Sequence, residues 1–307
     1  MNPWMPTAPC GPASCLLPPG SRAAWPRRTM RLAAVALVVL AGTALAFAGR
    51  GLGTTGRLRL TSAWSRLVLR AVGVRVEVRQ GFAFMAGSVS GLRPVTGVSG
   101  HRSATGVSGL RPVGDGPAGA APLVVANHVS WLDPLVMAAV LPCRLLAKRE
   151  VRAWPVVGLL AAGAGALFID RDRLLALPEA VDGVAAALAD GHPVAAFPEG
   201  TTWCGRGMGS FRPAVFQAAL DAGAPVRPVA IRYLEGDDVP ATGPAFVGDD
   251  PLWASLRRVV AVRRLTVQVT MLPAVWGRDR RELAWAAESS VASVVVAGAA
   301  HGLPVAA

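Results

Sequence analysis

Residues 124–134 read VVANHVSWLDP, and this stretch decides how we expect the chain to fold. Its apolar run ends at His128, as a buried strand does, and Asp133 followed by Pro134 predicts the start of a helix. The short connection can bring the Asp133 carboxylate to one imidazole nitrogen of His128, leaving the other nitrogen as a general base. A capping aspartate beside an incidental histidine is an equally good interpretation of these residues alone.

Strand and helix patterns alternate on both sides of this stretch. We expect strands at residues 72–79, 123–126, 144–147, 166–169, 194–197, 226–233 and 265–271. We expect helices at residues 134–140, 154–162, 174–190, 212–222 and 280–297. Such alternation is typical of helices that cover a parallel sheet. The sequence therefore predicts an α/β fold with a mostly parallel sheet flanked by helices.

Two later segments also place polar residues where a predicted strand ends. The segment GALFIDRDR delivers Arg171, and a guanidinium at the carboxyl end of a strand is well placed to bind a phosphate. Surface ion pairs are the alternative role for this segment. The segment VAAFPEGTT delivers Glu199, Gly200 and Thr201, in which the glycine lets backbone N–H groups approach a ligand. We expect the glycine-rich loop at 203–211 to cover the cleft.

Four blocks in this order, NHVSWLD, FIDR, FPEGTT and VRPVAI, resemble those of the PlsC-type glycerolipid acyltransferases. These are the 1-acylglycerol-3-phosphate acyltransferases and their relatives. The resemblance covers about residues 72–271, and four ordered blocks are more specific than any one of them. It implies an α/β domain that is preceded by membrane-associating helices. It also implies an enzyme that moves an acyl group from acyl-CoA or acyl-carrier protein to the free hydroxyl of a lysolipid.

The same resemblance assigns roles to individual residues. His128 is implied to deprotonate the acceptor hydroxyl, and Asp133 is implied to orient His128. Arg171 is implied to bind the headgroup phosphate. The residues implied to hold the glycerol part of the acceptor are Glu199, Gly200 and Thr201. Because a thioester donor is already activated, we expect no cofactor, no metal and no acyl-enzyme.

The sequence leaves the acceptor open. We expect 1-acyl-sn-glycerol-3-phosphate, which would give phosphatidic acid. However, Thr202 and Trp203 replace the arginine-serine pair that is frequent in the family after EGT, and this form is similar to members that acylate lyso-ornithine lipid. A non-catalytic membrane lipid-binding protein is the alternative from a different class. Three nine-residue repeats at 89–115 are rich in Gly, Ser and Pro, so we expect a flexible insertion without a catalytic role.

The N-terminal part predicts a leader and two helices. Residues 1–29 lack hydrophobic periodicity, so we expect a disordered leader, with translation starting at Met1 or Met30. Residues 32–48 are apolar, which favours a membrane anchor over a signal peptide or a buried helix. Residues 55–72 predict an interfacial or an ordinary amphipathic helix. The expected organisation is a leader at 1–29, membrane-anchoring helices at 30–71, an acyltransferase domain at 72–277, and a C-terminal helix and tail at 278–307.

Composition favours some partners and excludes others. The 307 residues are 52% hydrophobic and 16% charged, with a net charge of +12. This balance favours anionic membrane lipids, whereas dispersed arginines and a single tyrosine argue against nucleic acid. The four cysteines contain no CxxC pair, so we expect neither a disulfide framework nor a zinc site. We expect a membrane-associated enzyme at the inner or plasma membrane, with its active site on the cytoplasmic side.

Overall fold

The computed structural model describes residues 6–81, 120–170, 173–236 and 238–300. The predictions for Arg171 and for the insertion at 89–115 lie outside these residues. The described residues contain an eight-stranded sheet in the order β1-β8-β6-β2-β5-β3-β4, with β7 paired to β6. Its strands are β1 (Val74–Gln80), β2 (Leu123–Ala126), β3 (Arg144–Lys148), β4 (Leu167–Ile169), β5 (Val194–Ala196), β6 (Val226–Glu235), β7 (Val239–Pro240) and β8 (Leu265–Met271).

Strand direction places the candidate residues at one edge of the sheet. The five strands β6, β2, β5, β3 and β4 run parallel, each to its neighbour. Strand β8 is antiparallel to β6, and β1 is parallel to β8. The predicted mostly parallel sheet is therefore confirmed. Because parallel strands end at the same edge, the polar residues that follow β2 and β5 meet there.

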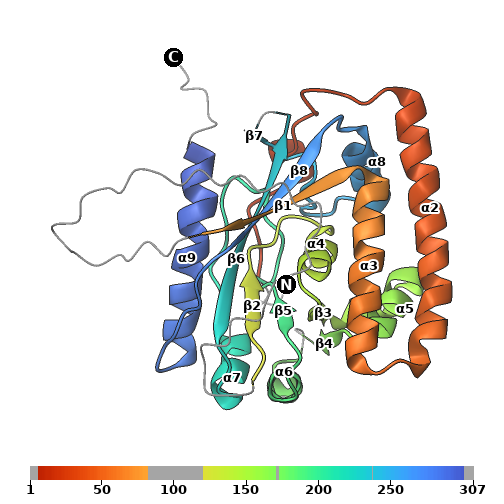
Figure 1. Ribbon diagram of the computed structural model, residues 1–307. Coiled ribbons are helices and arrows are strands. Elements are labelled where there is room, and N and C mark those ends of the chain that lie inside the picture. The colour runs from red at the N-terminus through yellow and green to blue at the C-terminus, as the bar shows by residue number, and fades with distance from the viewer. Residues whose placement is uncertain (1–5, 82–119, 171–172, 237, 301–307) are drawn as a thin grey trace.

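Helices cover both faces of the sheet, as Figure 1 shows for α3 and α9 on opposite sides. In β2, Val124 and Ala126 face one hydrophobic cluster, while Leu123 and Val125 face the other. The first cluster includes residues of α3 (Thr54–Val72), α4 (Asp133–Val140) and α8 (Leu252–Ala261). The second includes residues of α6 (Leu177–Ala189), α7 (Ala214–Asp221) and α9 (Arg280–Ala300). Burial on both faces explains why β2 is apolar throughout.

Smaller elements complete the fold. They are α1 (Pro12–Cys15), α5 (Pro155–Gly163) and the 3-10 turns Gly49–Gly51, Arg149–Ala153 and Leu174–Ala176. The last of these turns replaces the first part of the helix that we expected at 174–190. We did not predict α1, β7 or α8, although α8 buries one side of its amphipathic sequence through Ser255, Val259 and Val260.

Helices α2 (Trp25–Ala48) and α3 pack against each other at the edge of the domain (Figure 1). Gly42 permits this approach, because a Cβ there would lie 2.3 Å from the Trp64 indole nitrogen. That nitrogen donates to the Val38 carbonyl at 2.9 Å. Helix α2 is long and apolar enough to cross a membrane, with only 11% of its most apolar window buried. Leu37 and Leu40 are 69% and 67% exposed. This helix fits the expected membrane-associating element.

Within residues 6–29, which the structure describes, the expectation of a disordered leader at 1–29 is wrong. Residues 25–29 belong to α2, and Leu17, Ser21 and Arg22 attach the preceding segment to the domain. The backbone N–H and hydroxyl of Ser21 donate to Glu235 at 2.7 and 3.2 Å, and Arg22 forms a β-bridge with Val262. Ala23 is buried. These partners lie far along the chain, so composition near residue 20 gave no sign of them.

Candidate active site

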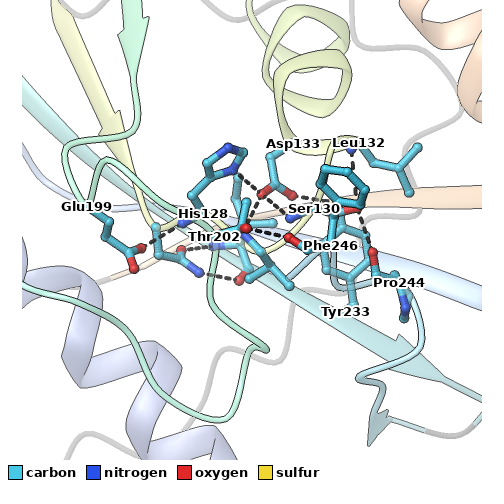
Figure 2. Close-up of polar contacts among 12 residues, drawn as sticks. His128, Ser130, Leu132, Asp133, Glu199, Thr202, Tyr233, Pro244 and Phe246 are labelled. Carbon is cyan, nitrogen blue, oxygen red and sulfur yellow. Dashed lines mark hydrogen bonds and ion pairs between the residues drawn. The ribbon is translucent and has the colours of Figure 1, made fainter. Parts of the chain in front are cut away.

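His128 lies just after β2 and faces Asp133, the first residue of α4 (Figure 2). The His128 Nδ1 atom is 2.8 Å from the Asp133 Oδ2 atom. The His128 side chain is 21% exposed, whereas that of Asp133 is fully buried. The imidazole thus combines a buried carboxylate on one nitrogen with partial access to solvent. The predicted approach of the two side chains is confirmed.

The Asp133 carboxylate closes the preceding turn instead of capping its helix. Leu132 is the N-cap of α4, so Asp133 lies one position later than we expected. Its Oδ2 also accepts from the backbone N–H groups of Val129 and Ser130 at 2.6 and 2.8 Å. Its Oδ1 accepts from the Tyr233 hydroxyl at 2.6 Å. These donors compensate for burying the charge and fix the carboxylate beside the histidine.

Tyr233 reaches Asp133 from β6, the strand that pairs with β2. Burial, together with the neighbouring Asp133 carboxylate, raises the pKa of Tyr233 well above its ordinary value. The phenol therefore stays protonated and remains a donor to Asp133. We did not predict this residue, because its partner is 100 positions away in the sequence.

Glu199 holds the backbone around His128 from the loop after β5. Its Oε1 accepts from the His128 N–H at 2.7 Å, and its Oε2 accepts from the Gly209 N–H at 2.8 Å. Burial raises the pKa of Glu199 to about 8, and these two N–H groups oppose the shift. The carboxyl therefore bridges the histidine and the 203–211 loop. Its expected contact with substrate stays a prediction.

The remainder of the FPEGTT block also contacts the histidine turn. Phe197 stacks on the His128 ring, with centroids 4.3 Å apart and planes at 18°. Gly200 has a φ of +73°, which disfavours any side chain there. Thr202 Oγ1 donates to the Phe246 carbonyl, and the Trp203 N–H donates to the His128 carbonyl at 2.8 Å. Phe197, Glu199 and Trp203 together fix the imidazole plane and both backbone polar groups of His128.

Asn127 and Ser130 anchor the turn to neighbouring segments. The Asn127 side chain exchanges two hydrogen bonds with the backbone of Ile231 in β6, at 3.0 and 2.8 Å. Ser130 Oγ donates to the Pro244 carbonyl at 2.7 Å, and the Phe246 N–H donates to the Val129 carbonyl at 2.9 Å (Figure 2 labels Ser130, Pro244 and Phe246). For these contacts, the sequence offered one signal, which was the position of Asn127 directly before the histidine.

Comparison with known proteins identifies the family to which this chain belongs. The Acyltransferase family model matches residues 110–232. The 1-acyl-sn-glycerol-3-phosphate acyltransferase of Neisseria gonorrhoeae is 38% identical over 188 residues, which cover 60% of this chain and 72% of that protein. The chain belongs to the PlsC-type acyltransferase family. It is therefore an enzyme, and the non-catalytic lipid-binding alternative is set aside.

A second curated relative and one solved structure are also similar to this chain. The lyso-ornithine lipid O-acyltransferase of Pseudomonas aeruginosa is 41% identical over 184 residues, covering 57% of this chain and 69% of that protein. The crystal structure of the 1-acyl-sn-glycerophosphate acyltransferase PlsC from Thermotoga maritima aligns with a TM-score of 0.52 and 19% identity. That alignment covers 89% of this chain and 97% of the Thermotoga chain, and it shows a shared fold.

The predicted site residues of this acyltransferase divide into two groups. His128, Asp133 and Glu199 lie together at the carboxyl edge of the sheet, and Gly200 and Thr201 follow directly in the same loop. Arg171 falls outside the described residues. Strand β4, which precedes it, is parallel to β3 and therefore ends at the same edge as β2.

Proposed function

We propose that this acyltransferase uses His128 as a general base to acylate the free hydroxyl of a lysolipid. The observation that carries the proposal is the 2.8 Å contact between His128 Nδ1 and the buried Asp133 Oδ2. Since a buried carboxylate favours a proton on Nδ1, the Nε2 lone pair is left to accept the hydroxyl proton. The phenylalanine stack and the backbone contacts hold that nitrogen in a fixed direction.

The reaction needs no covalent intermediate. As Nε2 takes the proton, the acceptor oxygen attacks the thioester carbonyl, the C–S bond breaks, and the imidazolium returns the proton to the leaving thiolate. Asp133 stabilises the imidazolium between these two transfers. Ser130 is not a nucleophile in this scheme, because its buried hydroxyl donates to the Pro244 carbonyl at 2.7 Å.

The proposed acceptor is 1-acyl-sn-glycerol-3-phosphate, with Arg171 binding the phosphate and Glu199, Gly200 and Thr201 near the glycerol. The name of the Neisseria relative supports this choice. The name of the Pseudomonas relative favours lyso-ornithine lipid as the second candidate. Thr202 argues little for either acceptor, since its hydroxyl donates to the Phe246 carbonyl within the protein. Acyl-CoA and acyl-carrier protein are both retained as donors, without a further cofactor.

We further propose that the enzyme docks on an anionic membrane from its cytoplasmic side, where thioester donors are found. The exposed apolar residues Leu37 and Leu40 of α2 support insertion into the acyl region. A cavity of about 410 Å³ lies where α2, α3, β1 and β8 meet. Its lining includes six arginines: Arg27, Arg31, Arg70, Arg75, Arg263 and Arg264. Such a concentration of positive charge favours anionic lipid headgroups.

An acyl-transfer assay with purified full-length protein in vesicles tests the proposal. Lysophosphatidic acid and lyso-ornithine lipid are offered as acceptors, each with acyl-CoA and with acyl-carrier protein. We expect the larger kcat/KM with lysophosphatidic acid, and only background transfer in the His128→Ala variant. A preference for lyso-ornithine lipid would overturn the proposed acceptor. Transfer to neither acceptor by the wild type would contradict the whole proposal.

A further inference from the structure

Three of the four cysteines gather beside the active-site loop. The Sγ atoms of Cys10, Cys15 and Cys204 all lie within 4.8 Å of one another. Cys10 and Cys15 lie around the short helix α1, and Cys204 follows Trp203 in the loop after β5. Our expectation of no metal-ligand spacing rested on sequence distance, whereas this cluster forms only when the N-terminal segment packs on the domain.

The spacing of the three sulfurs suits a tetrahedral metal ion. A Zn–S bond of about 2.3 Å places two ligand sulfurs roughly 3.8 Å apart in a tetrahedron. The sulfurs can therefore close onto one ion by small side-chain rotations. A disulfide would use two of the thiols and leave the third without a role. The mutual proximity of all three favours coordination.

The surroundings affect two of the thiols differently. Burial is the main cause that raises the pKa of Cys10 to about 12, whereas the contact with the Ser14 hydroxyl lowers the pKa of Cys15. Cys204 is buried, and Cys10 and Cys15 are half-buried. A bound cation would replace one proton on each thiol, and ligand binding would consequently release protons.

The cluster joins the segments that hold the histidine turn. Trp203, which precedes Cys204, donates its N–H to the His128 carbonyl at 2.8 Å. On the other side, a Cβ on Gly248 would lie 3.3 Å from the Pro12 side chain and 3.6 Å from the Cys10 carbonyl. Gly248 belongs to the same loop as Phe246, which contacts Val129 and Thr202. An ion at the cluster would therefore fasten the N-terminal segment to both loops.

We propose that Cys10, Cys15 and Cys204 form a binding site for a zinc ion. Three thiolate sulfurs occupy three tetrahedral positions, and water occupies the fourth, since the cluster includes no further His, Cys, Asp or Glu among the described residues. Each thiol gives up one proton to solvent when Zn²⁺ binds, so the three-thiolate site carries a net charge of −1. The ion has a structural role, and the acyl transfer proposed above does not pass through it.

Metal titration of the full-length protein tests this site without an activity assay. The purified protein is reduced, treated with a chelator and titrated with Co²⁺ as a spectroscopic probe, and then with Zn²⁺ as a competitor. We expect one equivalent of Co²⁺ to bind with a thiolate-to-cobalt charge-transfer band, which one equivalent of Zn²⁺ abolishes. A pH-indicator dye should report release of about three protons per ion.

Single substitutions show which thiols are ligands. Cys10→Ser, Cys15→Ser and Cys204→Ser should each weaken metal binding at least tenfold. Cys143→Ala is the matched control, because Cys143 lies in the core apart from the cluster, and its binding should equal that of the wild type. Circular dichroism checks that each variant is folded, and the Cys10 and Cys15 variants test the site even if Cys204→Ser unfolds.

Two results would overturn the proposal. One is metal binding that is unchanged in both folded variants, Cys10→Ser and Cys15→Ser. The other is the absence of a charge-transfer band in the reduced wild type. If two thiols then disappear from a free-thiol count on exposure to air, the cluster is a disulfide pair with a spare cysteine and not a metal site.

Discussion

His128 and Asp133 meet because they lie only five positions apart, across one tight turn. The carboxylate is also held in place by a more distant donor. Tyr233 supplies this donor from β6. In Tyr233→Phe, the Asp133 Oδ1 atom loses its hydrogen bond inside the protein. We expect the free energy of unfolding to fall by about 1–3 kcal/mol. Urea denaturation measures this change, and an unchanged midpoint would show that the phenol does not support the carboxylate.

The raised pKa of Glu199 predicts that the stability of the protein depends on pH. Its pKa in the folded protein, about 8, lies above the ordinary value of 4.5, mainly because of burial. The folded state therefore binds the proton more tightly than the unfolded state does. This group's contribution is complete below about pH 4.5 and is lost as the pH rises toward 8.

The Glu199→Gln variant isolates that contribution. The variant lacks the titrating group. As the pH rises from 5 to 8, the unfolding free energy of the wild type should therefore fall relative to that of the variant. Denaturation at several pH values provides the measurement. A difference that is independent of pH, or one that moves in the opposite direction, would show that Glu199 is already ionised in the folded protein at acidic pH.

At the scale of elements, the α2–α3 pair depends on one close contact. Gly42→Ala would place a methyl group against the Trp64 indole, 2.3 Å from its nitrogen, so the indole or the helices must shift. We expect a loss of about 1–3 kcal/mol in stability. Gly183→Ala in α6 is the matched control, because nothing lies within 4 Å of its Cβ position. The control should gain about 0.5–1 kcal/mol. Equal effects of the two substitutions on thermal unfolding would disprove this packing.

Local sequence patterns predicted most helices and strands. They could not predict contacts between residues that lie far apart in the sequence. Strands β2 and β8 have the predicted bounds, because a buried or alternating run shows the strand directly. The histidine–aspartate contact was predictable for the same reason, since both residues belong to one turn. The partners of Glu199 at 71 and of Tyr233 at 100 positions away were not. Neither was the packing of Ser21 on Glu235, which lies 214 residues later.

At the scale of the whole molecule, the arginine-lined cavity and the exposed face of α2 predict binding to anionic vesicles. Arg70 and Arg75 are exposed members of that lining. Each cation near a charged surface contributes about 1 kcal/mol, so Arg70→Gln with Arg75→Gln should weaken binding roughly tenfold or more. Arg281→Gln, on an exposed position of α9, is the control and should bind as the wild type does. Co-sedimentation with vesicles measures the partition.

Salt and lipid charge complete that test. Binding should fall with added salt and with the removal of anionic lipid, because the attraction is electrostatic. Equal partition of the double variant and the control, at every salt concentration, would show that the arginines do not face the membrane.

In the proposed reaction, His128 removes the acceptor proton. The most direct measurement is kcat for acyl transfer by purified His128→Ala, with His192→Ala as a control histidine in the turn after α6. General-base catalysis contributes about two to four orders of magnitude, so kcat should fall by that factor while thermal unfolding stays close to that of the wild type. His192→Ala should keep its activity. Near-normal turnover in a folded His128→Ala enzyme would contradict the account.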